Sequence, residues 1–375
     1  MLTEESRLRD FPSLAQRVYL NTAAEGIPPQ AVLDSLVQYG QDKLLGMDGR
    51  LLHQEQWSQA RAKVARFMGF RAEDIAICSC SSEAYNLVMM AMQLQDGDEV
   101  VINDLDFPAG ATPWLSESSK ATVKVWRHRD GVLDPEDLRA LLSPKTRLVN
   151  TSLVSYYNGF AIDVQEISNV VRKHSNALFA VDVTQAYARS PLDLKGVDLV
   201  VSSTHKWLLG PHGGGLVAVA PERAKELTAH AGGWFNLDNA FEESRFDSLK
   251  TKSGAGSFMV GMPNYAAIYA INAALGYIES VGVSGINEHA NRLVSLARTA
   301  IAELPVELLG PVTTPRTSGI IAFKHPEFEM INSMLHRENI HLMAHAGRMR
   351  VAIHGYNNEA DIHQMLAGLE KALSA

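Results

Sequence analysis

The sequence predicts an α/β protein whose larger part is a mainly parallel, doubly wound sheet. Short runs rich in Val, Ile and Leu, such as 147–153 and 177–183, alternate with segments of helical periodicity such as 164–174. This alternation places helices on both faces of a parallel sheet, whose ligands bind at the carboxyl ends of the strands. No G-x-G-x-x-G pattern follows a strand, so a dinucleotide site is not expected.

The first two thirds of the chain supply this sheet. An extended segment at 18–26 breaks into a turn, and the pair of prolines that follows it begins a helix. In chain order, the expected helices are 29–45, 53–69, 87–94 and 164–174, and the expected strands are 74–78, 99–102, 121–127, 147–153, 177–183 and 197–201.

The pattern changes after Pro263, and the length of 375 residues is itself too great for one ordinary core. Helices are expected at 264–281, 284–304, 328–338 and 358–373, with short strands at 306–309, 319–323 and 349–353. We predict a large domain at 16–260 and a smaller α+β domain made of 1–15 and 261–375.

Composition excludes several classes of function. The formal net charge is -8, and no basic tract occurs, so nucleic acid is not an expected partner. The N-terminus has no apolar signal region, and no run of 18 apolar residues occurs, so no membrane span is expected. The only cysteines, Cys78 and Cys80, alternate along one expected strand and therefore should not pair. A reduced, cytoplasmic protein is the expectation.

The strongest functional signal is Lys206. It follows the apolar run 197–201 and the polar residues 202–205, and it precedes a glycine-rich stretch at 208–215 that can turn tightly against a ligand. A lysine held away from water loses basicity and becomes nucleophilic, so Lys206 is a candidate Schiff-base amine. Taken alone, however, a lysine at the end of a strand is more often one whose amine reaches water, and only the residues described next favour the functional interpretation.

Other polar residues end neighbouring strands. Asp182 closes the strand 177–183, Gln185 lies three residues later, and Ser81 and Ser82 stand between a strand and a helix start. Each has an ordinary interpretation, as an ion pair or a helix cap. Together with a lysine they match pyridoxal phosphate, which needs an amine for its aldehyde, a carboxylate for its ring nitrogen, a donor for its phenolic oxygen and a phosphate cup.

These motifs resemble the class V aminotransferase branch of the fold-type I pyridoxal-phosphate enzymes, which includes cysteine desulfurases and isopenicillin N epimerase-like proteins. The resemblance spans nearly the whole chain, and its strongest motifs are Val-Asp-Val-Thr-Gln at 181–185 and Ser-Thr-His-Lys at 203–206, followed by Gly-Pro-His-Gly at 210–213. It implies this fold, this cofactor, an amino acid or amine as substrate, and a homodimer with its active site at the subunit interface.

The resemblance also implies roles for single residues. Lys206 would form the Schiff base, Asp182 would pair with the pyridine nitrogen, and Gln185 would contact the phenolic oxygen. Phe107 would stack on the ring, although an ordinary core aromatic is the alternative. Arg350 would clamp the substrate carboxylate. The residues matching the phosphate contacts are Ser81, Ser82, Ser203 and His205. The substrate pocket would be built from loops such as 21–26, with Asn21, and 232–243.

Two features depart from the family pattern: the residue at position 262 and the cysteine content. In the family, a threonine at the position of Met262 reaches the phosphate bound by the partner subunit. Because Met262 replaces it here, a backbone N–H or Ser257 would have to make this contact. Arg348, two residues before Arg350 on the same strand face, is a weaker candidate for the carboxylate clamp, and we interpret it first as a solvated charge. No cysteine follows Cys80, so the mobile catalytic cysteine of the desulfurases is missing. The histidines after 340 are irregularly spaced, and no metal site is predicted.

We therefore predict an enzyme that acts at Cα of an amino acid, as an aminotransferase or an isopenicillin N epimerase-like protein. The alternative is a C–S or other β-lyase. A third possibility is a cofactor-binding protein without catalysis, which the presence of Arg350 disfavours.

Overall fold

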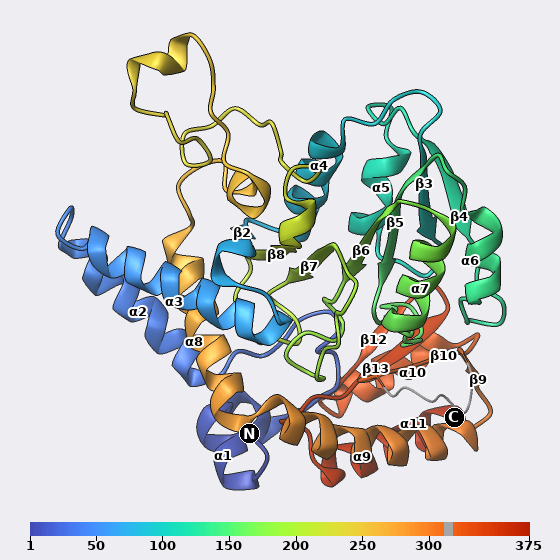
Figure 1. The fold of residues 1–375 in the computed structure, drawn as a ribbon. Coiled ribbons are helices and arrows are strands. Elements are labelled where there is room, and N and C mark those ends of the chain that lie inside the picture. The colour runs from blue at the N-terminus through green and yellow to red at the C-terminus, as the bar shows by residue number, and fades with distance from the viewer. Residues whose placement is uncertain (311–317) are drawn as a thin grey trace.

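A seven-stranded sheet forms the main body of the computed structural model, which describes residues 1–310 and 318–375 (Figure 1). In spatial order its strands are β2 (Ile75–Cys78), β8 (Gly215–Val219), β7 (Leu199–Ser203), β6 (Leu178–Asp182), β5 (Thr146–Ser152), β3 (Glu99–Asn103) and β4 (Thr122–Trp126). The five strands from β7 to β4 run parallel, whereas β8 is antiparallel to both of its neighbours. The predicted mainly parallel sheet is confirmed.

Helices cover both faces of this sheet, as β6 illustrates. Phe179 on β6 lies in the same hydrophobic core as Val171, whereas the next residue, Ala180, lies in a second core with Val88. Successive strand residues point to opposite faces, so the two cores occupy opposite sides. The helices of this part are α4 (Ser81–Met92), α5 (Pro108–Leu115), α6 (Pro135–Leu141) and α7 (Val164–His174).

The second sheet is antiparallel and four-stranded. Its spatial order is β12 (Met343–His345), β13 (Arg348–Ala352), β10 (Ile320–Lys324) and β9 (Glu307–Leu308). Its core includes side chains of α9 (Val283–Ala302), α10 (Phe328–Arg337) and α11 (Glu359–Leu373). The orange and red ribbons of Figure 1 show this unit below the carboxyl ends of the parallel strands.

Three further helices flank the main sheet: α2 (Gln30–Leu44), α3 (Arg50–Met68) and α8 (Tyr265–Val281). Figure 1 shows α2 and α3 as an arm that projects from the body. Ile271 and Leu275 of α8 pack in the same core as Val64 of α3. The remaining helical segments are α1 (Glu4–Asp10), η1 (Pro12–Gln16), η2 (Ala72–Asp74), η3 (Pro221–Arg223), η4 (Glu243–Phe246) and η5 (Gly254–Phe258). The division of the chain near residue 260 stays a prediction.

Some elements differ from the sequence-based expectation. The strand β8 was not expected, because its glycine-rich approach reads as a turn. Cys80 does not lie on a strand with Cys78: it is the N-cap of α4, and both thiols are unpaired. The short strands β11 (Ile340–His341) and β12 were also missed, whereas β1 (Val18–Tyr19), which pairs in parallel with β11, lies in the segment expected to be extended.

No single helix in residues 1–310 and 318–375 is long and apolar enough to cross a membrane; α8 and α9 pass that test only as a pair, with a 75° bend between them.

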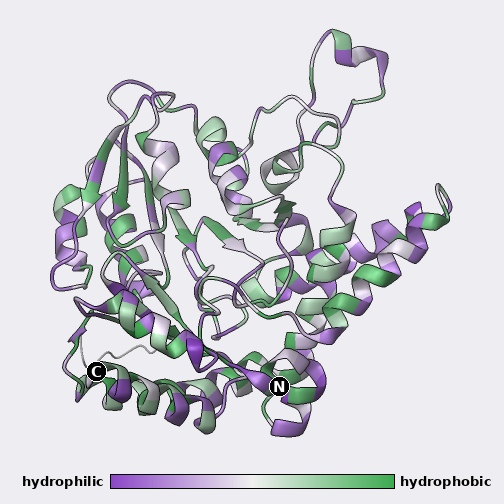
Figure 2. Cartoon of the chain, turned by 180° about the vertical axis from the view of Figure 1, so that it is seen from behind, coloured by the Kyte–Doolittle hydropathy of each residue, from purple (hydrophilic) through white to green (hydrophobic). Residues whose placement is uncertain are grey.

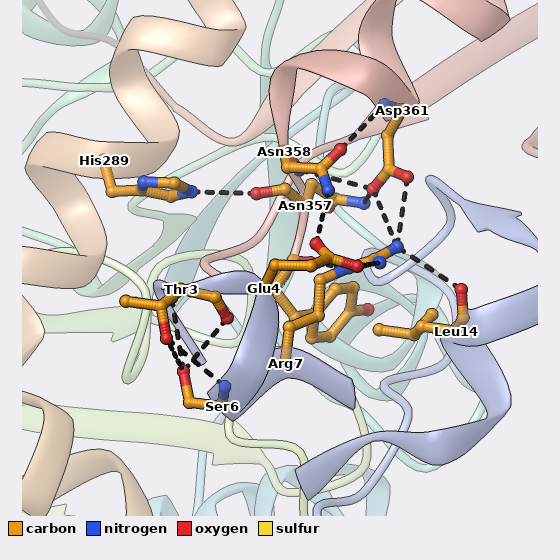
Figure 3. Close-up of polar contacts among 10 residues, drawn as sticks. Thr3, Glu4, Ser6, Arg7, Leu14, His289, Asn357, Asn358 and Asp361 are labelled. Carbon is orange, nitrogen blue, oxygen red and sulfur yellow. Dashed lines mark hydrogen bonds and ion pairs between the residues drawn. The ribbon is translucent and has the colours of Figure 1, made fainter. Parts of the chain in front are cut away.

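The first and last helices are joined by a buried ion pair (Figure 3). Arg7 of α1 donates from Nη2 to Asp361 of α11 over 3.1 Å, and from Nε to the carbonyl oxygen of Tyr356 over 2.8 Å. The Arg7 and Asp361 side chains are only 7% and 6% exposed. Asp361 also caps its own helix through Asn358. Arg7 also pairs with Glu4 through Nη1 over 3.1 Å, whereas Arg7 is the only cation paired with Asp361 among the described residues, so removal of Arg7 leaves a buried carboxylate without its cation.

We expect Arg7→Met to lower the free energy of unfolding by about 3–5 kcal/mol, because it strands the buried Asp361 carboxylate. Chemical denaturation followed by circular dichroism measures this loss. Arg9→Met, at an exposed arginine of the same helix, is the matched control and should change little. Equal effects of the two substitutions would contradict the assignment.

Candidate active site

A cavity of about 620 Å³ lies at the carboxyl ends of the parallel strands. One wall carries Ser152, Asp182 and Ser203, the last residues of β5, β6 and β7, and the opposite wall comes from β12 and β13. The register of the sheet sets these three strand ends side by side. Of the residues singled out in the sequence, those that line this cavity are Ser81, Ser82, Phe107, Asp182, Gln185, Ser203, His205, Lys206 and Arg350.

Lys206 is held by the backbone on both sides. The N–H of Gly26 donates to the carbonyl oxygen of His205 over 2.8 Å. A Cβ at residue 26 would lie 2.0 Å from the Lys206 carbonyl oxygen, so only glycine allows this approach. The next residue, Trp207, is fully buried, and its carbonyl oxygen accepts a hydrogen bond from Nε2 of His354 over 2.9 Å.

The amine of Lys206 is buried, with 8% of the residue exposed. Burial lowers its pKa to about 8, and the nearby charge of Asp182 opposes this shift. The Nζ atom lies 4.9 Å from the centre of the Phe107 ring. A pKa near 8 leaves about a tenth of the amine neutral, and nucleophilic, at pH 7.

Asp182 accepts two hydrogen bonds at the end of β6. The backbone N–H of Thr184 donates to Oδ1 over 2.8 Å, and the hydroxyl of Tyr85 donates to Oδ2 over 3.2 Å. Burial nevertheless raises the pKa of Asp182, and burial also raises that of the neighbouring Asp106 to about 7. Sequence reasoning missed Tyr85, although it follows Ser81 by four residues on α4 and so shares its face.

The amide of Gln185 has partners within the chain. Its Oε1 accepts from Nε1 of Trp207 over 2.6 Å, and its Nε2 donates to the carbonyl oxygen of Ala23 over 3.1 Å. These bonds fix the Gln185 amide between the end of β6, the segment that follows Lys206 and the loop 21–26. The second proton on Nε2 has no partner among the described residues and remains available to a ligand in the cavity.

The start of α4 opens into the cavity. The thiol of Cys80, not Ser81 or Ser82, caps the helix by accepting from the N–H of Glu83. This leaves the Ser81 hydroxyl free to accept from Oγ of Ser203 over 3.1 Å, whereas Ser82 is exposed. Free N–H groups and hydroxyls at a helix N-terminus suit a phosphate.

His205 stacks on His212, with ring centres 4.5 Å apart and 18° between the planes. Burial lowers the pKa of His205 to about 4, so the ring is neutral at pH 7. The nitrogens of both rings and a Glu25 carboxylate oxygen lie within 4.8 Å of one another. Parallel rings direct their in-plane lone pairs side by side, not at one tetrahedral centre, so we assign no ion to this group.

Arg350 and Arg348 both lie on β13 and line the cavity. Arg350 donates from Nη1 to the carbonyl oxygen of Tyr156 over 2.8 Å, and burial lowers its pKa to about 10. The interpretation of Arg348 as a solvated charge is wrong: the residue is 6% exposed. Residues two apart on a strand point to the same face of the sheet, and the segment at 156–157 covers this face at both arginines.

Other expected features lie elsewhere. Asn21 does not line the cavity, and its buried Oδ1 has no partner among the described residues. Trp234, in the loop 232–243, does not line it either. Ser257 cannot replace the threonine lost at Met262, because it is fully buried and its hydroxyl already bonds the N–H of Ala229 and a carbonyl oxygen.

Lys206 should react as a nucleophile at lower pH than the exposed lysines. We expect its rate of reductive methylation in cofactor-free protein to rise with pH through about 8, because the neutral amine reacts. Mass spectrometry of peptides measures the modification of each lysine. Asp182→Asn removes the charge that raises this pKa and should move the midpoint lower, whereas Asp193→Asn, at an exposed site, should not. A midpoint equal to that of the exposed lysines would refute the assignment.

Comparison with known proteins places the chain in a family. Over 365 residues it is 27% identical to an uncharacterised aminotransferase of Bacillus subtilis, YcbU, covering 95% of this chain and 94% of that protein. A cysteine desulfurase of Dickeya dadantii is 30% identical over 402 residues, covering 96% and 95% of the two chains.

The fold also matches solved structures. The apo structure of the cysteine desulfurase of Thermococcus onnurineus superposes with a TM-score of 0.89 over 100% of this chain and 99% of that one, at 22% identity. The model of the protein family described as aminotransferase class-V matches residues 18–365 of this chain. The chain therefore belongs to the class V aminotransferase family of pyridoxal-phosphate-dependent enzymes.

Proposed function

We propose that this enzyme acts at Cα of an amino acid, as an aminotransferase or an epimerase-like enzyme, with Lys206 as the residue that binds the cofactor. The observation that supports this most directly is a buried lysine with a lowered pKa in the same cavity as the half-buried carboxylate of Asp182 and a buried arginine. A buried amine costs free energy, and binding of a cofactor offers a reason for the protein to bear that cost.

The residues present fit pyridoxal phosphate. The cavity has the volume of a small-molecule site. The start of α4, with Ser81 and Ser203, offers donors to a phosphate, and His205 lies in the same lining. Asp182 is suited to the pyridine nitrogen, and the free proton of Gln185 Nε2 to the phenolic oxygen. Phe107, which is 46% exposed at the cavity wall, is suited to stack on the ring.

When bound, the cofactor supplies an electron sink for bonds broken at Cα. Asp182 holds a proton on the pyridine nitrogen, and the hydrogen bonds from Tyr85 and Thr184 keep its oxygens in place. Arg350 would bind the substrate carboxylate through its two-pronged guanidinium and so orient the bonds at Cα. Lys206, neutral in a substantial fraction near pH 8, takes and returns the proton at Cα.

A β-lyase is the second candidate, favoured by the relatives named cysteine desulfurase. Persulfide chemistry on an enzyme cysteine is not part of this proposal. The chain has two cysteines: Cys78 is buried and its thiol pKa is raised by burial, while the thiol of Cys80 caps α4. Both cysteines lie at or just before the start of α4, where the proposed phosphate donors are, and not on β13.

We also propose that the active form is a homodimer in the cytoplasm. The tip of the arm formed by α2 and α3 exposes large apolar side chains, including Leu44, Met47 and Leu51, which are 87%, 75% and 74% exposed. Figure 2 shows this apolar tip at the end of the arm. A second copy is the occupant that the family resemblance implies. Two unpaired thiols fit a reducing compartment.

We expect the purified protein to show the visible absorption band of lysine-bound cofactor, and Lys206→Ala to lose it. With one amino acid and no keto acid, an aminotransferase should exchange this band for that of the pyridoxamine form. A lyase should instead regain the band while pyruvate, alanine or sulfide accumulates. Absence of the band after addition of pyridoxal phosphate would refute the proposal.

The double substitution Met47→Glu and Leu51→Glu should weaken dimerisation about 100-fold or more, because it places charges among the apolar side chains of the arm. Sedimentation equilibrium measures the dissociation constant, and circular dichroism confirms that the variant is folded. Leu115→Glu is the control: this leucine is 60% exposed, and its helix α5 lies on another part of the molecule (Figure 1). A wild-type monomer would contradict the dimer.

A further inference from the structure

The cavity wall formed by β13 carries two buried cations. Arg348 and Arg350 are 6% and 4% exposed and alternate along the strand, so their side chains leave the same face. Both line the cavity that contains Lys206. Two strand residues in this relation are about 7 Å apart, which suits two acid groups on one short amino acid.

Neither arginine is neutralised by the protein. Among residues 1–310 and 318–375, no carboxylate forms an ion pair with either guanidinium. Their hydrogen-bond partners are backbone carbonyl oxygens: Arg350 bonds that of Tyr156, and Arg348 bonds those of Tyr156 and Tyr157. The Nε of Arg350 is buried and has no partner in the described part of the chain. Buried cations of this kind call for anionic ligands.

One substrate carboxylate accounts for only one of them. The function proposed above uses Arg350 for the α-carboxylate, and Arg348 then remains as a second cation in the same wall. Its guanidinium lies over the ring of Tyr157, with 4.3 Å between its carbon and the ring centre. Its Nη1 is the only nitrogen with a partner among the described residues, which leaves Nε and Nη2 free to donate.

The neighbouring strand distinguishes the two positions. In the β12–β13 register, Met343 is opposite Arg350 and His345 is opposite Arg348. Cross-strand partners share a face, and both residues of β12 also line the cavity. Arg350 thus has an apolar neighbour, whereas Arg348 has an imidazole that can donate to an anion.

We propose that Arg348, assisted by His345, binds a second anionic group on the substrate side chain, so that the preferred substrates are acidic amino acids with a side-chain carboxylate. This specificity rests on the proposed function, since it uses the same cavity and the same α-carboxylate site. The alternative is that Arg348 serves only to tie β13 to the segment at 156–157.

The test compares acidic and neutral amino acids with the holoenzyme. We expect kcat/KM for aspartate or glutamate to exceed that for alanine or 2-aminobutyrate. Arg348→Met should lower kcat/KM for the acidic substrates about 10- to 100-fold and leave the neutral ones within about threefold, since it removes a charge-assisted hydrogen bond to the side chain alone. His345→Gln should give a smaller loss of the same selectivity. Arg139→Met, at an exposed arginine of α6, should change neither.

Binding without turnover gives a second readout. Wild-type holoenzyme should bind succinate more tightly than butyrate in a calorimetric or spectral titration, and Arg348→Met should abolish the difference. Equal losses for acidic and neutral substrates, or equal binding of succinate and butyrate by the wild type, would overturn the proposal and favour the tie to 156–157.

The titration also separates the two proposals. Were no amino acid to react, the proposed function would fail, while a succinate preference that depends on Arg348 would still support the anion site. Should Arg348→Met fail to fold, His345→Gln and the wild-type comparison of succinate with butyrate decide the question.

Discussion

The withdrawal of the Lys206 amine from water is the constraint on which this site depends. A buried ammonium is unfavourable, and the protein reduces the cost with the carboxylate of Asp182 while allowing the pKa to fall. Several distant segments hold that balance in place. The backbone of Gly26 packs closely against the carbonyl group of Lys206, and His354 bonds the carbonyl oxygen of Trp207. The hydroxyl of Tyr85 donates to the carboxylate of Asp182. The chemistry of the site therefore depends on packing as much as on the reactive groups.

Most of the scaffold was predictable because its signals are local. The helix at 164–174 was placed at its observed bounds, since an aspartate caps its start and basic residues fill its last turn. Buried parallel strands read as apolar runs; β6 ends at Asp182, and β7 ends at Ser203, three residues before Lys206. Because parallel strands end at one edge of a sheet, the sequence could also group the residues that line the cavity.

What could not be predicted depends on tertiary contacts. Arg348 has the sequence context of an exposed strand residue, and only the segment at 156–157 folding over it makes it buried. Ser257 looked available to a ligand, but its hydroxyl is used inside the core. The strand β8 was not predicted, because the glycines at its start indicate a turn. Glycine is needed there for close packing, since a Cβ at Gly215 would lie 2.4 Å from the carbonyl group of Cys80. Close packing required a residue type that elsewhere indicates a turn.

The pairing of β1 with β11 has a consequence for how the chain is made. Val18 lies opposite Ile340, and Arg7 meets Asp361, so the beginning of the chain finds its partners only near the end. During synthesis, residues 7–19 must wait until residues 340–361 have left the ribosome, whereas the parallel strands can assemble earlier. Contacts this distant in sequence slow folding and lengthen the life of partly folded states. The loop 21–26, which packs against Lys206, directly follows β1, and β1 pairs only once β11 is available. We therefore expect the reactive centre to be completed among the last steps of folding.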